Sequence, residues 1–189
     1  MRIILNITLL ALFAATQPGC GRALDATFDA APDGGQARQE ARQEARQTIT
    51  GEVVAVADGD TITVLDTNRR QYRVRLAGID APESGQDFGQ ASKKNLSAAV
   101  FGKAVEVSYS KLDRYGRVLG IVRLGGRDIN LAQVEAGLAW HYKEYADEQT
   151  AEDRERYAAA ETRARGERAG LWQQADPVKP SEFRRGKRN

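Results

Sequence analysis

Five short segments rich in β-branched residues occupy the middle of this chain, and tight-turn signals separate them. Apolar and polar residues alternate within the segments, and Asp58-Gly59-Asp60 lies between the first two. Asp-Gly between β-prone segments is a strong hairpin signal, so the pattern predicts short antiparallel strands. The five predicted strands cover residues 49–56, 61–65, 72–79, 105–109 and 117–124.

Three amphipathic stretches predict helices around and after these strands. They cover residues 86–101, 130–139 and 147–165, and the first of them interrupts the strand series. Five short strands with one internal helix and terminal helices match a small Greek-key barrel. We therefore expect an α+β, mainly β protein: a five-stranded OB-fold Greek-key barrel with about three helices.

The scarcity of two residue types limits the chemistry. The 189 residues include one Cys and one His, His141, which excludes a disulfide framework and a Cys/His zinc site. Hydrophobic residues make up 41% of the chain, enough to build a core and to exclude a wholly disordered protein. Any catalysis is expected to depend on carboxylates, arginines and a hard cation.

The N-terminal 47 residues differ from the rest of the chain. Residues 1–20 read as a leader, with Met1-Arg2 followed by a short apolar run, and predict an exported protein. Cys20 follows Gly19 as in a lipoprotein signal, whereas Gln17 departs from that pattern, so a lipidated Cys20 that tethers the protein to a membrane and a leader without lipid both remain open. The expected location is secreted or periplasmic, or lipid-anchored to the cell envelope.

The remaining boundaries follow from composition. Residues 21–47 form a low-complexity tether in which Ala-Arg-Gln-Glu repeats, 48–172 form the folded domain, and 173–189 form a loose basic tail. Residues 179–189 carry a net charge of +4 and residues 48–178 a net charge of −2. The folded domain is therefore not a basic nucleic-acid-binding surface, and phosphate binding there would need a local patch.

Three polar motifs lie at the ends of predicted strands. They are Asp58-Gly59-Asp60-Thr61, Arg75 with Asp80-Ala81-Pro82-Glu83, and Asp113-Arg114-Tyr115-Gly116-Arg117. If the strand ends converge, Asp60 and Asp80 would repel each other unless a hard cation such as Ca²⁺ lay between them. The arginines would offset charge on a phosphoryl group, and Glu83 would take a proton from an attacking water. The combination predicts phosphodiester hydrolysis.

The three motifs, in this order and spacing, resemble the staphylococcal nuclease (thermonuclease) family over residues 48–172. The resemblance implies a Ca²⁺-dependent hydrolase that cuts DNA and RNA with low sequence specificity, as an endonuclease or exonuclease. Its metal ligands would be the carboxylates of Asp60 and Asp80 and the backbone carbonyl of Ala81. Glu83 would be the general base, and Arg75 and Arg117 would bind the phosphate in the transition state.

The same resemblance implies substrate contacts from Arg114, Tyr115 and a further tyrosine, for which Tyr142 and Tyr145 remain alternatives. We expect a monomer that prefers single-stranded or frayed nucleic acid.

The sequence leaves two other functions open. One is a non-catalytic nucleic-acid-binding OB-fold module, and the other is a structural protein in which the leader and tail matter most. The presence of all five proposed metal-binding and catalytic side chains favours the enzyme: Asp60, Arg75, Asp80, Glu83 and Arg117.

Overall fold

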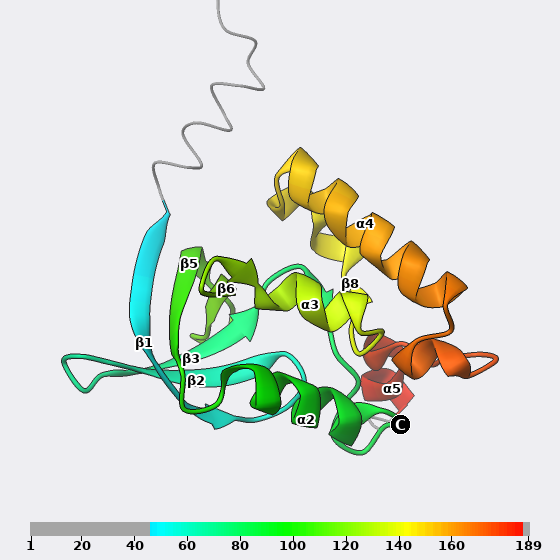
Figure 1. Ribbon diagram of the computed structural model, residues 1–189, viewed down its shortest axis with the longest axis horizontal. Helices are drawn as coiled ribbons and strands as arrows, with labels where there is room; N and C mark the ends of the chain where they lie inside the picture. The colour runs from blue at the N-terminus through cyan, green and yellow to red at the C-terminus, as the bar shows by residue number, and fades with distance from the viewer. Residues whose placement is uncertain (1–45, 187–189) are drawn as a thin grey trace, which may run out of the picture. The chain divides into compact units, whose positions relative to one another are not determined.

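The computed structural model describes residues 46–186, which contain a closed β-barrel with helices around it (Figure 1). The leader, Cys20 and nearly all of the tether lie outside the described residues. Five main strands form the barrel, as the alternating sequence pattern predicts. They are β1 (Gln47–Val56), β2 (Thr61–Asp66), β3 (Gln71–Leu76), β5 (Ala104–Leu112) and β6 (Val118–Leu124).

The barrel is closed by one parallel pairing in an otherwise antiparallel sheet. The strand order is β3-β2-β1-β5-β6, and β3 then pairs with β6 in parallel, with Arg75 opposite Leu119. Asn130 reinforces this closure: its Nδ2 donates to the carbonyls of Ala77 and Gly120, both at 3.0 Å, and its Oδ1 accepts from Val122 N at 3.1 Å. The predicted five-stranded OB-fold barrel is confirmed.

Helices cover the barrel and position the loops between its strands. The helices α2, α3 and α4 correspond to the three predicted ones; α3 packs against β6, α2 and α4. The short strands β4 and β8 pair with each other beside these helices, and β7 pairs with β6 in antiparallel fashion. The bounds are β4 (Ile79–Asp80), α2 (Gly89–Val100), β7 (Arg127–Asp128), α3 (Ile129–Glu135), β8 (Trp140–His141), η1 (Lys143–Glu148), α4 (Ala151–Gly166), η2 (Gly170–Gln173) and α5 (Pro180–Gly186).

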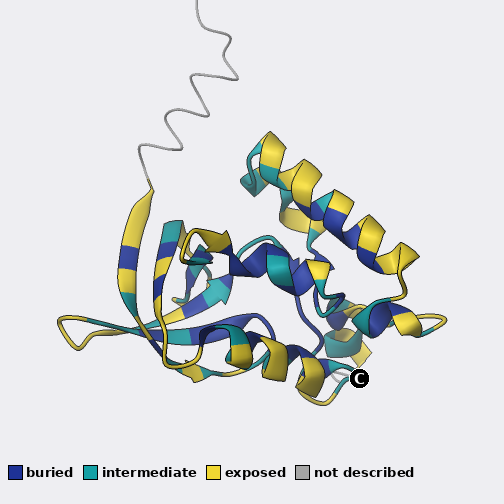
Figure 2. Cartoon of the chain, in the orientation of Figure 1, coloured by how far each residue is buried: buried dark blue, intermediate teal, exposed yellow. Residues whose placement is uncertain are grey.

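The core fills the barrel and continues under α3 and α4 (Figure 2). Alternate strand residues such as Val53, Val64 and Val122 are fully buried. A second cluster forms around Trp140 and Trp172, whose rings meet edge to face with centroids 4.3 Å apart. The two tryptophans are therefore core residues.

Three local details differ from the sequence-based expectations. The third strand ends at Leu76 rather than at residue 79, because Gly78 adopts a φ of +74° and turns the chain. The last long helix begins at Ala151, where the Thr150 hydroxyl caps it by accepting from Asp153 N at 3.0 Å. The segment predicted as a loose tail contains the helix α5. Within residues 46–186, no helix is long and apolar enough to span a bilayer.

Candidate active site

The turn between β1 and β2 places Asp60 inside the barrel mouth. Asp58 caps the turn, because its Oδ1 accepts from the Asp60 amide at 3.0 Å. Gly59 packs so closely under α2 that a Cβ there would collide with the Ser92 side chain. Gln133 of α3 fixes the same turn by donating from Nε2 to the Gly59 carbonyl at 2.8 Å. Two helices therefore hold a turn that the sequence shows only as Asp-Gly-Asp.

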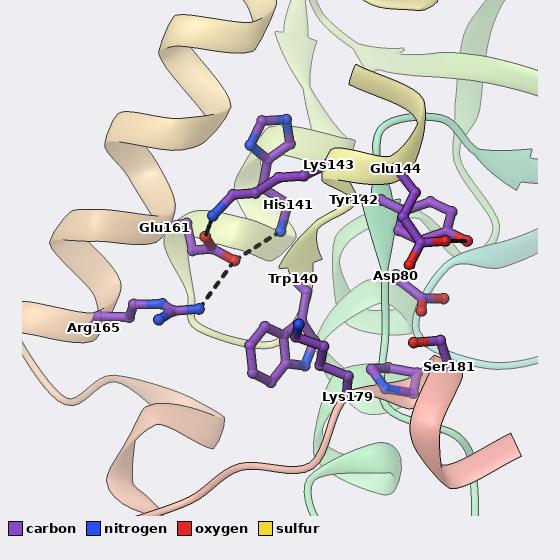
Figure 3. A pocket seen from close by; sticks show the side chains of 11 residues that line it. Asp80, Trp140, His141, Tyr142, Lys143, Glu144, Glu161, Arg165, Lys179 and Ser181 are labelled. Carbon is purple, nitrogen blue, oxygen red and sulfur yellow. Dashed lines mark hydrogen bonds and ion pairs between the residues drawn. The ribbon is translucent and has the colours of Figure 1, made fainter. Parts of the chain in front are cut away.

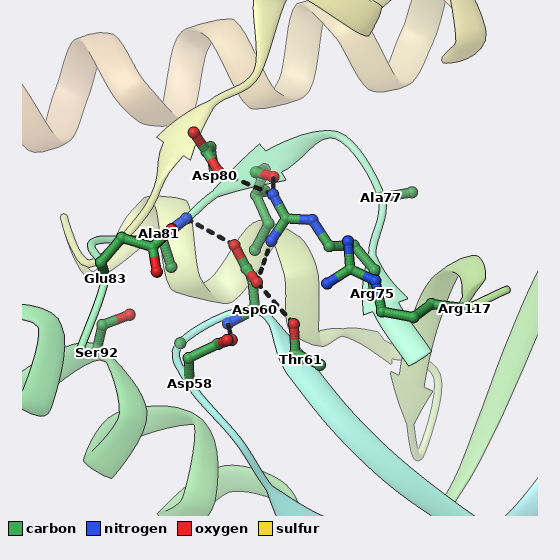
Figure 4. A network of polar contacts seen from close by, with 12 residues as sticks. Asp58, Asp60, Thr61, Arg75, Ala77, Asp80, Ala81, Glu83, Ser92 and Arg117 are labelled. Atoms are coloured by element: carbon green, nitrogen blue, oxygen red, sulfur yellow. Dashed lines mark hydrogen bonds and ion pairs between the residues drawn. The ribbon is translucent and has the colours of Figure 1, made fainter. Parts of the chain in front are cut away.

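Arg75 joins the two predicted metal carboxylates (Figure 4). Its Nη1 forms an ion pair with Asp60, and its Nη2 lies 2.8 Å from Asp80 Oδ1. The β2–β3 ladder sets this arrangement, because Thr61 pairs with Arg75 and the amide of Leu76 donates to the Asp60 carbonyl at 2.8 Å. The structure thus brings Asp60 and Asp80 together, as the motif spacing predicts.

The segment after β3 carries Asp80, Ala81 and Glu83 across the barrel mouth. Asp80 lies in the short β4 strand opposite Trp140, and the Ala81 amide donates to Asp60 Oδ2 at 2.9 Å. Asp60, Asp80 and Ala81 are almost fully buried, at 2%, 2% and 4% exposure, whereas the Glu83 side chain is 35% exposed. Glu83 therefore stands at the solvent edge of a buried acidic pair.

The pKa values of these groups reflect a surplus of buried negative charge. Burial and the neighbouring Asp60 raise the pKa of Asp58 to about 6. Burial also opposes ionisation of Asp60, but the Arg75 guanidinium and the Ala81 amide outweigh it and hold the pKa of Asp60 below its usual value. Burial raises the pKa of Asp80 despite its two guanidinium partners. A cation would relieve this surplus charge.

Arg117 directly precedes β6 and is held by the turn that begins at Asp113. Asp113 Oδ1 accepts from the amides of Tyr115 at 2.8 Å and Arg117 at 2.9 Å, and its Oδ2 accepts from Arg117 Nε at 2.7 Å. These donors outweigh the effect of burial and lower the pKa of Asp113. The Arg117 side chain extends toward Arg75 in Figure 4. Arg75 lies in β3 and Arg117 directly precedes β6, and these two strands pair in parallel.

The same turn places two predicted substrate contacts in solvent. Tyr115 is 65% exposed. The guanidinium carbons of Arg114 and Arg117 lie 4.9 and 5.4 Å from the centre of its ring. An exposed aromatic ring flanked by two guanidiniums offers a stacking face and charge to a nucleotide.

A cavity of about 150 Å³ adjoins Asp80 between β8, α4 and α5 (Figure 3). Tyr142 lines this cavity, and its hydroxyl donates to Glu144 Oε2 at 3.1 Å. Burial and this hydrogen bond raise the pKa of Tyr142 to about 12. Tyr145 is 48% exposed and packs against Tyr142, with ring centroids 5.1 Å apart, outside the lining of the cavity.

His141 is a structural residue. Its ring is buried, with Nε2 2.8 Å from Gln149 Oε1, and its amide donates to Glu161 at 3.2 Å. Glu161 also pairs with Lys143 and Arg165 at the far side of the cavity.

Sequence reasoning missed three residues of the site. Ser92 and Gln133 position the Asp58–Asp60 turn from α2 and α3, and their chemistry is too ordinary to mark them in a sequence. Arg184 of α5 pairs with both Asp80 and Glu83. Its signal was the basic composition of residues 179–188, but composition gave no sign of where that segment folds.

Comparison with known proteins decides the family. A family model described as staphylococcal nuclease homologue matches residues 73–174. The chain belongs to the staphylococcal nuclease family. Within this family, the chain is 43% identical over 148 residues to a micrococcal nuclease of Shigella flexneri, covering 74% of this chain and 82% of the relative.

Two further relatives of the family are named as endonucleases. An uncharacterized endonuclease of Haemophilus influenzae is 42% identical over 136 residues, which cover 72% of this chain and 73% of the relative. An uncharacterized endonuclease of Escherichia coli is 43% identical over 140 residues, covering 74% and 87%. The family match ends at residue 174, so α5 and Arg184 lie beyond it.

Proposed function

We propose that this protein is a nuclease that hydrolyses phosphodiester bonds of DNA and RNA with the help of Ca²⁺. The observation that carries the proposal is the buried group of Asp60, Arg75 and Asp80, with Glu83 at its solvent edge. Membership of the staphylococcal nuclease family and relatives named as endonucleases support the same activity.

The donor chemistry fits a hard cation. Asp60 and Asp80 present buried carboxylate oxygens, and Ala81, whose amide donates to Asp60, would supply a backbone carbonyl. In the described part of the chain, no three acidic, His or Cys side chains come together as a ready metal cage. The cation would therefore complete its shell with the carbonyl and with water, as Ca²⁺ commonly does. When bound, it would polarise a phosphoryl oxygen.

The protein's own side chains perform the remaining steps. Glu83, half-buried at the mouth, accepts the proton of the attacking water while the water oxygen bonds to phosphorus. The bond from phosphorus to the leaving oxygen then breaks, and that oxygen takes up a proton from solvent water. Arg75 and Arg117 stabilise the negative charge that grows on the phosphoryl oxygens. Arg117 needs little reorganisation, because Asp113 already fixes its guanidinium.

Substrate binding would depend on the backbone of the nucleic acid. Arg114 and Tyr115 form an exposed charged and aromatic surface at one side of the site. Tyr142 is the better of the two tyrosine candidates, because it lines the cavity next to Asp80 and Tyr145 does not. Contacts of this kind bind phosphates and stack on any base, which gives low sequence specificity and favours single-stranded or frayed substrates.

The test compares nuclease activity with and without the cation. The purified chain is incubated with plasmid DNA, denatured DNA or RNA, in Ca²⁺ or in a chelator, and Glu83→Gln is run as the inactive control. We expect digestion that needs Ca²⁺ and is fastest on denatured DNA. Binding without digestion would instead support the alternative function, a non-catalytic nucleic-acid-binding module.

We also propose that the protein is exported and acts as a monomer. The apolar leader and Cys20 support export. Residues 21–47 would form a spacer between a lipid anchor or cleavage site and the barrel. Mass spectrometry of the mature N-terminus would distinguish a lipidated Cys20 from a simple cleaved leader. Size-exclusion chromatography with light scattering would test the monomer.

A further inference from the structure

The helix α5 places a guanidinium on the buried Asp80 and on Glu83, which stands at the solvent edge of the candidate active site. Arg184 Nη1 lies 2.7 Å from Glu83 Oε1 and 3.3 Å from Asp80 Oδ1, and its Nη2 lies 3.1 Å from Asp80 Oδ2. These partners are 101 and 104 positions away in the sequence. Arg184 therefore contacts both a proposed metal carboxylate and the proposed general base.

The oxygens of Asp80 are largely occupied by the two arginines. Oδ1 accepts from Arg75 Nη2 at 2.8 Å and from Arg184 Nη1, and Oδ2 accepts from Arg184 Nη2. A carboxylate has about four lone-pair positions, so three are already used. A divalent cation coordinates carboxylate oxygens at roughly 2.3–2.6 Å, which would bring it against the positive charge of Arg184.

The anchoring of α5 is slight compared with that of the barrel. Gln86, in the loop after Glu83, donates from Nε2 to the Val178 carbonyl, and Gln174 donates to Asp87 Oδ2 at 2.9 Å. Pro180 is the one buried residue among the seven of α5. A helix of this length has little stability of its own, so its position depends on tertiary contacts, among them these hydrogen bonds and the ion pairs of Arg184.

We propose that α5 is a removable cover of the active site, in which Arg184 competes with the divalent cation for Asp80 and occupies Glu83 until the cation binds. This inference rests on the cation proposed above. Asp60, Asp80 and Glu83 face two guanidiniums while α5 is in place, and only that of Arg75 after it leaves. The uncovered site is therefore the more negative one and binds the cation more tightly.

The test measures Ca²⁺ binding directly, by isothermal titration calorimetry on the full chain. Arg184→Ala is compared with the wild type and with Arg185→Ala, which removes the same charge from an exposed position of the same helix. We expect Arg184→Ala to lower the Kd for Ca²⁺ by about tenfold, because a nearby positive charge is lost. Arg185→Ala should change it less than twofold. Arg184→Lys, which keeps the charge without the bidentate fork, should lie between.

A second readout follows the helix itself. Ca²⁺ should speed tryptic cleavage after Arg184 and Arg185 of the wild type, and Arg184→Ala should be cleaved after Arg185 equally fast with and without Ca²⁺. Equal Ca²⁺ affinity in all variants would overturn the cover and leave the proposed nuclease intact. A raised KM for nucleic acid with unchanged Ca²⁺ affinity would make Arg184 a substrate contact instead. If neither the wild type nor Arg184→Ala binds Ca²⁺ at millimolar concentration, both the cover and the Ca²⁺ dependence are wrong.

Discussion

Asp80 accepts hydrogen bonds from two arginines that the fold presents in different ways. Arg75 comes from β3 within the barrel, where its backbone pairs with Thr61 on one side and Leu119 on the other, and its side chain is 15% exposed. Arg184 comes from a seven-residue helix at the end of the described chain, and its side chain is 37% exposed. The chemistry of the two ion pairs is the same, and their anchoring differs.

This difference separates a permanent part of the site from a removable one. Moving Arg75 would break the barrel ladder, so its guanidinium must remain while substrate binds. Moving Arg184 breaks its ion pairs with Asp80 and Glu83 but leaves the barrel ladder intact, because Arg184 comes from a short helix and not from a strand. Equal ion pairs on one carboxylate can therefore have opposite consequences for function.

The largest effect is expected from Arg75. Arg75→Ala should lower kcat by about 10²- to 10⁴-fold at saturating Ca²⁺, because a fixed donor to the transition state is lost. Arg184→Ala should not lower kcat under the same conditions. Steady-state kinetics on denatured DNA check both variants, and equal losses in the two would remove the distinction between the arginines.

Glu83 should show the next effect. Glu83→Gln keeps the shape and one hydrogen-bond acceptor for Arg184 but cannot take a proton, so kcat should also fall by about 10²-fold or more. The melting temperature should stay within a few degrees of the wild type, because the side chain is 35% exposed. Rates near the wild-type value would discredit Glu83 as the general base.

Asp60 tests the inner half of the cation site. Asp60→Asn removes one charge from a buried ligand and should weaken Ca²⁺ binding by at least about tenfold, measured by calorimetry. Arg184→Ala should have the opposite effect and strengthen Ca²⁺ binding. An unchanged calcium dependence in Asp60→Asn would contradict the metal assignment.

Asn130 tests the anchoring of Arg75 through the barrel. Asn130→Ala removes the hydrogen bonds to the carbonyls of Ala77 and Gly120 and from the amide of Val122. Gly120 keeps its bond from the Ala77 amide, and the loss should cost about 2–4 kcal/mol of unfolding free energy. Urea denaturation measures the loss, with the exposed Asn68→Ala as a control expected within about 0.5 kcal/mol. A loss below 1 kcal/mol would show that the β3–β6 closure does not need this side chain.

The smallest effect concerns Asp58 and depends on pH. Its pKa is raised to about 6, so the native state binds a proton more tightly than the unfolded chain, and ionisation destabilises the fold as the pH rises from about 4 to about 6. Asp58→Asn has no carboxyl group to ionise, so it does not lose fold stability in this way as the pH rises. Its melting temperature should exceed that of the wild type at pH 7 and approach it at pH 4, in thermal scans without divalent ions. A constant difference across this range would contradict the raised pKa.

The local pattern of the sequence predicted most of the barrel. Alternation gave the five strands, and the hydrophobic pattern gave α2, α3 and α4 to within a few residues. The errors lie where one residue's geometry decides, as at Gly78, which ends β3 earlier than predicted, and at Thr150, which starts α4 later. The α5 helix was missed because its sequence is short and charged and begins at a proline, and its position depends on contacts with a distant loop.

By itself, the sequence determined the barrel class and the acidic and basic groups available to a site, and its single Cys and single His leave too few ligands for a disulfide framework or a Cys/His zinc site. Those properties follow from local periodicity and residue type, which act over a few positions. Only the tertiary structure decided that Arg75 joins Asp60 to Asp80, that Tyr142 rather than Tyr145 lines the neighbouring cavity, and that Arg184 lies on Asp80 and Glu83. Contacts between residues up to 104 positions apart depend on strand register and helix docking, which no local pattern specifies.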